Sequence, residues 1–147
     1  MKKIVVINDP NLNLLRRIEI SIYGEKDLKT IEKIIVEEGK KFDFQVEFFQ
    51  SNHEGEIIDK IHEGDNFDGI IINPGGYSHT SIAILDAIKS IKAPVIEVHL
   101  SNVFKREDFR RDLITGSGAK GVVLGLGYIS YLAAIYSLYL LFKEEKV

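Results

Sequence analysis

The feature that most constrains the fold of this chain is a set of four-residue runs that are mostly apolar and β-branched. They are residues 4–7, 69–72, 95–98 and 121–124. A strand with one face in water alternates apolar and polar residues, whereas a strand covered on both faces has a continuous apolar run. The runs therefore predict a parallel sheet that lies between two layers of helices.

Segments with helical spacing alternate with these runs. Leucine and isoleucine recur at helical spacing in residues 28–35, 57–61 and 82–88. Ser51 and Glu54 have the spacing of a capping box, so we expect them to begin the second of these helices.

The alternation of strands and helices defines the fold class. One further strand is expected at residues 46–49, and residues 128–142 form an apolar final helix. Five strand–helix units in 147 residues predict one domain, residues 1–147, with an α/β architecture. We expect a flavodoxin-like three-layer sandwich whose five-stranded parallel sheet has the order 2-1-3-4-5.

Composition excludes several classes of protein. The formal net charge of −3 argues against a nucleic-acid surface, and the absence of cysteine excludes disulfides and thiolate chemistry. The apolar run after Lys3 is too short for a signal peptide, so we expect a cytoplasmic protein. Residues 128–142 fall short of the ~20 residues that a membrane span requires, so we expect burial in the core or in a subunit contact.

Polar residues cluster where three of the strands are expected to end. Asn8 ends the first strand, Asn73 ends the third, and Glu97 and His99 end the fourth. In a sheet of this order, ligands bind beyond the carboxyl ends of the strands, between strands one and three. We therefore expect the functional site at this edge.

Glu97 and His99 lie two residues apart on a strand, so both side chains face the same side. A carboxylate beside an imidazole fixes its tautomer and favours its protonated form, which suits a general acid. The alternative is structural: Glu97 pairs with a helix residue and His99 caps the next loop. The two residues alone leave both interpretations open.

Gly75 and Gly76 let the backbone approach a ligand, and the helix that follows offers free amides to an anion. An ordinary glycine turn is the commoner explanation of such a pair. His79, at the start of this helix, either binds a ligand or caps the helix.

Residues 9–26 form an unusually long connection, of a length often found in functional lids. Tyr23 lies there near Arg16 and Arg17, and neighbouring cations would favour its phenolate, a usable base. The alternative is a packing tyrosine beside solvated arginines. Likewise, an arginine of residues 106–111 either clamps a carboxylate or belongs to an exposed, salt-bridged turn.

Five motifs gather these residues in order along the chain. They are Asn8-x-Pro10-Asn11-Leu12-Asn13-Leu14-Leu15, Tyr23-Gly24, Phe48-x-Gln50-Ser51-Asn52-x-Glu54-Gly55, Asn73-Pro74-Gly75-x-Tyr77-x-His79-Thr80-Ser81 and Glu97-Val98-His99-Leu100-Ser101-Asn102. In this order and spacing they resemble the signatures of the type II 3-dehydroquinate dehydratases, and Arg106-Glu107-x-Phe109-Arg110 and Gly121-Val122 extend the match.

The resemblance implies the reversible dehydration of 3-dehydroquinate to 3-dehydroshikimate in the shikimate pathway, without metal, cofactor or lysine Schiff base. By carry-over, Tyr23 is the base that removes a proton next to the ketone. Asn11 helps to hold a water that stabilises the enol(ate) intermediate. His99, oriented by Glu97, protonates the departing hydroxyl.

The resemblance also implies the residues that bind the substrate. Asn73, His79 and Arg110 are expected at its hydroxyls, and the amides of Leu100 and Ser101 at its carboxylate. Asp86 matches the residue that approaches the site of a neighbouring subunit, since family members are typically dodecamers built from trimers.

Several positions depart from the family pattern. Ile18 stands where the lid of the family has its arginine, so we expect Arg17, or alternatively Arg16, to supply the cation. Asp9 replaces the usual glycine after Asn8 and adds a carboxyl near the site of an anionic substrate. Residues 111–114 replace a histidine-rich stretch.

These departures keep a second hypothesis open, a catalytically impaired relative that binds a small cyclic carboxylate. A flavin-based electron carrier or a response-regulator receiver is a third class. No hydroxyl-rich phosphate loop follows the first strand, and the third strand ends in Asn73 rather than an aspartate, so the sequence argues against both.

Overall fold

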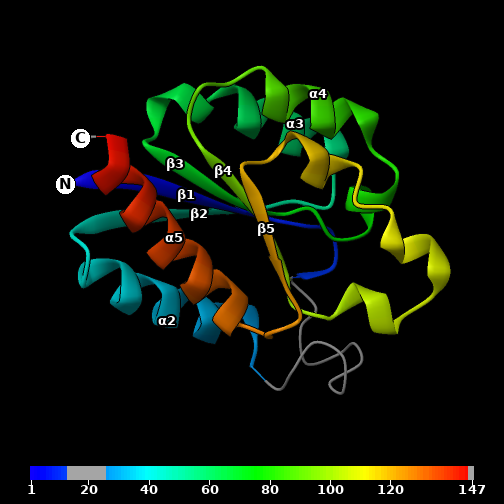
Figure 1. Ribbon diagram of the computed structural model, residues 1–147, viewed down its shortest axis with the longest axis horizontal. Helices are drawn as coiled ribbons and strands as arrows, with labels where there is room; N and C mark the ends of the chain where they lie inside the picture. Colours follow the sequence, from blue (N-terminus) through cyan, green and yellow to red (C-terminus); the bar gives the residue numbers. More distant parts are fainter. Residues whose placement is uncertain (13–25, 146–147) are drawn as a thin grey trace.

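The computed structural model describes residues 1–12 and 26–145, which form a five-stranded sheet between two layers of helices (Figure 1). All strand pairs are parallel, and the order β2-β1-β3-β4-β5 confirms the predicted fold class and topology. The strands are β1 (Lys2–Asn8), β2 (Phe44–Gln50), β3 (Gly69–Asn73), β4 (Val95–His99) and β5 (Gly121–Leu124).

Helices cover both faces of the sheet, with α2 and α5 on one side and α3 and α4 on the other (Figure 1). The α-helices are α2 (Leu28–Lys40), α3 (Glu54–His62), α4 (Ile82–Lys89) and α5 (Ile129–Glu145). Short 3-10 helices connect them: η2 (Gly64–Asn66), η3 (Gly75–His79), η4 (Val103–Lys105), η5 (Asp108–Arg111) and η6 (Thr115–Gly118).

The central strands divide their side chains between two hydrophobic clusters. On β1, Ile4 and Val6 pack in the cluster beneath α2 and α5, whereas Val5 and Ile7 pack against α3 and α4. Successive side chains of a strand point to opposite faces, so a strand inside two helical layers must be apolar at every position. This explains why the strand reads as an uninterrupted apolar run.

The edge strand β5 departs from the prediction that its run is covered on both faces. Its residues are partly buried or exposed, and Val122 is 38% exposed. Among the described residues, only β4 pairs with it, because β5 is the outermost strand of the sheet. The apolar run therefore predicted the position of this strand correctly, but the prediction that both of its faces are buried was wrong.

The start of α3 differs from the expected capping box. His53 occupies the N-cap, and Ser51 accepts a hydrogen bond from the His53 amide (2.9 Å) while donating to Glu56 (2.5 Å). Glu54 instead accepts from Ser81 Oγ at 2.6 Å, and the same oxygen of Ser81 caps α4 at the amide of Ile84. Ser51 pairs with Glu56 of the same helix and Glu54 with the distant Ser81, so the capping box does not form.

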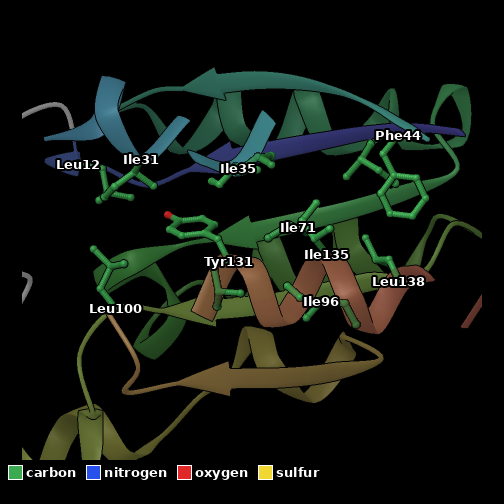
Figure 2. Packing of buried hydrophobic residues seen from close by; sticks show 14 of the residues in the cluster. Leu12, Ile31, Ile35, Phe44, Ile71, Ile96, Leu100, Tyr131, Ile135 and Leu138 are labelled. Carbon is green, nitrogen blue, oxygen red and sulfur yellow. The ribbon is translucent and has the colours of Figure 1, made fainter. Parts of the chain in front are cut away.

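Tyr131 ties α5 to the ends of two strands. Its hydroxyl donates to Asn8 Oδ1 at 2.7 Å and accepts from Asn73 Nδ2 at 3.1 Å. The hydroxyl points toward the end of the sheet where Leu12 and Leu100 lie (Figure 2). Burial raises the pKa of Tyr131, so the phenol keeps the proton that this bridge requires.

The apolar helix α5 is only partly enclosed. Tyr131, Ile135 and Leu138 are fully buried, whereas Tyr136 and Leu140 are 50% and 42% exposed. Across the described residues, no helix combines the length and apolar character that crossing a membrane requires.

Replacing Tyr131 with phenylalanine should lower the free energy of unfolding by about 1–3 kcal/mol, because buried amide groups of Asn8 and Asn73 lose their partner. Urea unfolding followed by circular dichroism measures this. The matched control is Tyr136→Phe on the exposed face of the same helix, which should change stability by less than about 0.5 kcal/mol. Equal stability of the two variants would contradict the bridge.

Candidate active site

A cavity of about 630 Å³ opens at the carboxyl ends of the strands, where the strand order predicts a site. Four segments enclose it: the residues after β1, the β3–α4 connection, the residues after β4, and η5. The lining residues are Asp9, Pro10, Asn11, Leu12, Asn73, Gly75, Gly76, Tyr77, His79, Thr80, His99, Leu100, Ser101, Val103, Arg106 and Arg110.

Glu97 and His99 form a hydrogen-bonded pair at the end of β4. His99 Nε2 lies 2.8 Å from Glu97 Oε2, and the carboxylate is fully buried. A carboxylate only accepts, so Nε2 carries the hydrogen and Nδ1 is the nitrogen left for a ligand. His99 lines the cavity, so the pair has the geometry of an oriented proton donor.

Two hydroxyls complete the surroundings of Glu97. Thr115 Oγ1 donates to Glu97 Oε1 at 2.5 Å, and Ser78 Oγ donates to Oε2 at 2.9 Å. A buried carboxylate is costly unless donors satisfy it, and here three groups do so. Sequence reasoning missed both hydroxyls, because Thr115 lies 18 residues beyond Glu97 and no local pattern joins them.

His79 lies next to this pair at the cavity wall. Its ring is stacked on that of His99, with 6.4 Å between centroids, and its Nδ1 is 2.9 Å from the carbonyl of Asp112. Partial burial lowers the pKa of His79, outweighing the opposing effect of the Asp112 carbonyl. A neutral ring that donates from Nδ1 leaves Nε2 as a hydrogen-bond acceptor, which suits a ligand hydroxyl.

Asn73 and Asn11 belong to the wall of the cavity. The amide nitrogen of Asn73 donates to Tyr131, and its carbonyl oxygen accepts from the Gly75 amide at 3.2 Å. Asn11 adopts a positive φ of 72°, and its backbone amide donates to Asn52 Oδ1 at 2.9 Å. The structure therefore fixes the orientation of Asn73 and the backbone of Asn11.

The remaining wall favours an anion. Arg106 and Arg110 line the cavity, and Arg110 also pairs with Glu107. Arg106 Nη1 lies 3.4 Å from Ser101 Oγ. Within residues 1–12 and 26–145, the backbone amides of Leu100 and Ser101 donate to no backbone carbonyl. Such amides beside guanidinium groups suit a carboxylate.

The structure brings together seven of the predicted residues: Asn11, Asn73, His79, His99, Leu100, Ser101 and Arg110 all line the cavity, and Glu97 contacts His99 from behind. Asp86 lies on the exposed side of α4 and does not line it. Tyr23 and Arg17 lie outside the described residues. In the described part of the chain, no cluster of three or more acidic, histidine or cysteine side chains has the arrangement of a metal site.

The family model for class II dehydroquinases matches residues 2–139 of this chain. The chain is 51% identical over 136 residues to 3-dehydroquinate dehydratase 1 of Agrobacterium fabrum, covering 92% of this chain and 94% of the relative. It is 52% identical over 136 residues to the 3-dehydroquinate dehydratase of Clostridium botulinum, covering 92% of each.

A solved structure has the same fold and similar sequence. The type II dehydroquinase from Butyrivibrio crossotus superposes with a TM-score of 0.90 at 46% sequence identity, covering 93% of this chain and 97% of that one. The similarity thus extends from the sequence to the whole arrangement of the sheet and helices.

His79 should titrate below 6.5, the ordinary value for histidine, because partial burial disfavours its charged form. Proton NMR of the ring C–H signals against pH measures this, with the His79→Gln spectrum identifying the signal. In the folded protein this ring therefore becomes protonated only at a pH below the ordinary histidine pKa of 6.5. A midpoint at or above 6.5 would contradict the neutral, accepting ring.

Proposed function

This chain belongs to the class II dehydroquinase family, and we propose that the residues around His99 carry out the reaction of that family. The chain is a hydro-lyase that eliminates water reversibly from 3-dehydroquinate and forms 3-dehydroshikimate, a step of the shikimate pathway. The observation that carries the assignment of roles is the buried Glu97–His99 pair at the cavity wall.

His99 serves as the general acid. With Nε2–H held by Glu97, the imidazolium form of the ring carries a second proton on Nδ1, gives it to the hydroxyl that leaves as water, and is left as neutral imidazole. Thr115 and Ser78 keep Glu97 in one orientation, so the imidazole ring is held as well. Holding the ring in one orientation lowers the entropy cost of aligning the proton donor with the substrate.

Tyr23 serves as the base in this proposal. It removes a proton from the carbon next to the ketone, and the electron pair forms an enol(ate) that then expels the hydroxyl. Arg17 supplies the cation that favours the phenolate, with Arg16 as the alternative. Asn11, at the cavity wall, holds the water beside the enol(ate) oxygen.

Binding groups are assigned by their chemistry. Asn73, His79 and Arg110 meet the substrate hydroxyls, and the amides of Leu100 and Ser101 meet the carboxylate. These steps move protons and one hydroxyl only, so they invoke no redox or group-transfer cofactor.

We further propose an assembly, the dodecamer of trimers implied by the family resemblance, with Asp86 reaching a neighbouring subunit. The exposed apolar side chains Ile129, Tyr136 and Leu140 of α5 and Phe109 of η5 support subunit contacts of some kind. The cytoplasmic location also stays a prediction.

The purified protein should raise ultraviolet absorbance when mixed with 3-dehydroquinate, because the product is a conjugated enone. His99→Ala should lower kcat by about 10²–10⁴-fold, the usual contribution of a positioned acid. The control is His62→Ala, an exposed histidine of α3, which should keep wild-type turnover. No absorbance change with the wild type at high concentration, despite tight binding in calorimetry, would indicate a binding protein instead.

Thr115→Val should lower kcat about tenfold, because Glu97 loses one of its three donors while the shape of the side chain is kept. Thr115→Ser, which restores the hydroxyl, should recover most of the loss. The exposed Thr30→Val on α2 is the control and should stay near wild type. An unchanged kcat of Thr115→Val would show that the Thr115 hydroxyl does not help to position His99.

A further inference from the structure

Asp9 lies in the cavity wall, directly after the last residue of β1. Its carboxyl group packs on Gly75, so closely that a Cβ added at Gly75 would lie 1.7 Å from Asp9 Oδ2. Only glycine at position 75, with its φ of +56°, leaves room for this carboxyl. The side chain is therefore held against the same connection that carries Asn73 and His79.

The carboxyl of Asp9 has an unusual environment for an acidic group. Its Oδ1 atom is enclosed and has no hydrogen-bond partner among the described residues. By contrast, the backbone carbonyl of Asp9 is engaged, accepting from Gln50 Nε2 at 2.9 Å and from the Leu12 amide at 3.4 Å. The backbone carbonyl of Asp9 thus has hydrogen-bond donors, whereas the Oδ1 atom of its side chain has none among the described residues.

No cation of the described segments forms an ion pair with Asp9. Burial raises the pKa of Asp9 well above its ordinary value, and its own backbone amide offsets this only in part. The charged and titratable groups that share its surroundings are Tyr77 and His79 of η3, His99 of β4, Arg106, Arg110 of η5 and Tyr131 of α5.

The protonation state decides what this group can do. An ionised carboxylate at the wall would repel an anionic ligand and would stay desolvated. A protonated carboxyl is neutral and has an O–H donor, and Asp9 lines the cavity in which a ligand oxygen would accept that hydrogen bond.

We propose that Asp9 is a specificity residue of this site, which in its protonated form donates a hydrogen bond to a hydroxyl or carbonyl oxygen of the bound substrate. The inference rests on the proposed function, because it needs a polyhydroxylated carboxylate in the cavity.

Kinetics of two variants test the contact. Asp9→Ala should raise KM for 3-dehydroquinate by about threefold to tenfold and leave kcat within about twofold, because one hydrogen bond to the ground state and transition state alike is lost. Asp9→Asn keeps the shape and a donor without the charge, so its KM at pH 7 should stay within about twofold of wild type. The exposed Asp59→Asn of α3 is the matched control.

The pH dependence separates a proton donor from mere packing. As the pH rises and Asp9 loses its proton, KM of the wild type should rise, whereas KM of Asp9→Asn should lack that component. Parallel KM profiles of the two proteins, or an Asp9→Ala enzyme with wild-type KM, would overturn the proposal.

A direct measurement covers the case in which Asp9→Ala fails to fold. Carbon-13 NMR of aspartate carboxyls, with Asp9→Asn identifying the signal, should show that Asp9 keeps its proton to a higher pH than an ordinary aspartate, and a titration midpoint at the ordinary value would overturn the proposal. If the wild type does not turn over 3-dehydroquinate, the proposed function fails by itself. In that case the dissociation constants of 3-dehydroquinate for wild type and Asp9→Ala, measured by calorimetry, test the Asp9 contact on its own. Equal dissociation constants would argue against the contact.

Discussion

All five strands of the sheet run in the same direction, and the place of the cavity follows from this. Because every strand runs the same way, every carboxyl end meets at one edge, and the loops that follow must converge there. Asn8, Asn73 and His99 come from three strands far apart in the sequence and reach one edge of the sheet for this reason. The apolar faces supply the stability, and the edge is left for chemistry.

Buried polar groups at this edge are satisfied by tertiary partners. Glu97 accepts from His99, Ser78 and Thr115, and Tyr131 bridges Asn8 and Asn73. Both networks are enclosed, where an unmatched polar atom is costly, so each member restricts the orientation of the next. The result is a cavity wall whose side chains are held in place before a ligand arrives, which lowers the cost of ordering on binding.

Much of the fold and part of the site could be predicted from local patterns. The apolar runs predicted four of the five strands, residues 46–49 were predicted separately as the other, and the alternating helical segments predicted the topology. The two-residue spacing of Glu97 and His99 predicted a shared side, and the side chains meet at 2.8 Å. The predicted capping box at Ser51 does not form, because Glu54 accepts a hydrogen bond from Ser81 at the start of another helix. The prediction that β5 is covered on both faces was wrong, because an apolar run does not indicate that a strand lies at the edge of the sheet.

Local patterns were enough to predict what repeats at short range: strand and helix periods, the direction of the sheet, and the residue types at the strand ends. These follow from backbone geometry and the alternation of side chains, which need no knowledge of distant residues. The folded structure was needed to show that Thr115 donates to Glu97, that Tyr131 joins two strand ends, and that Asp9 packs against Gly75. Those contacts depend on how separate elements pack, and a hydrogen bond or a desolvated carboxyl exists only once that packing has removed water from it.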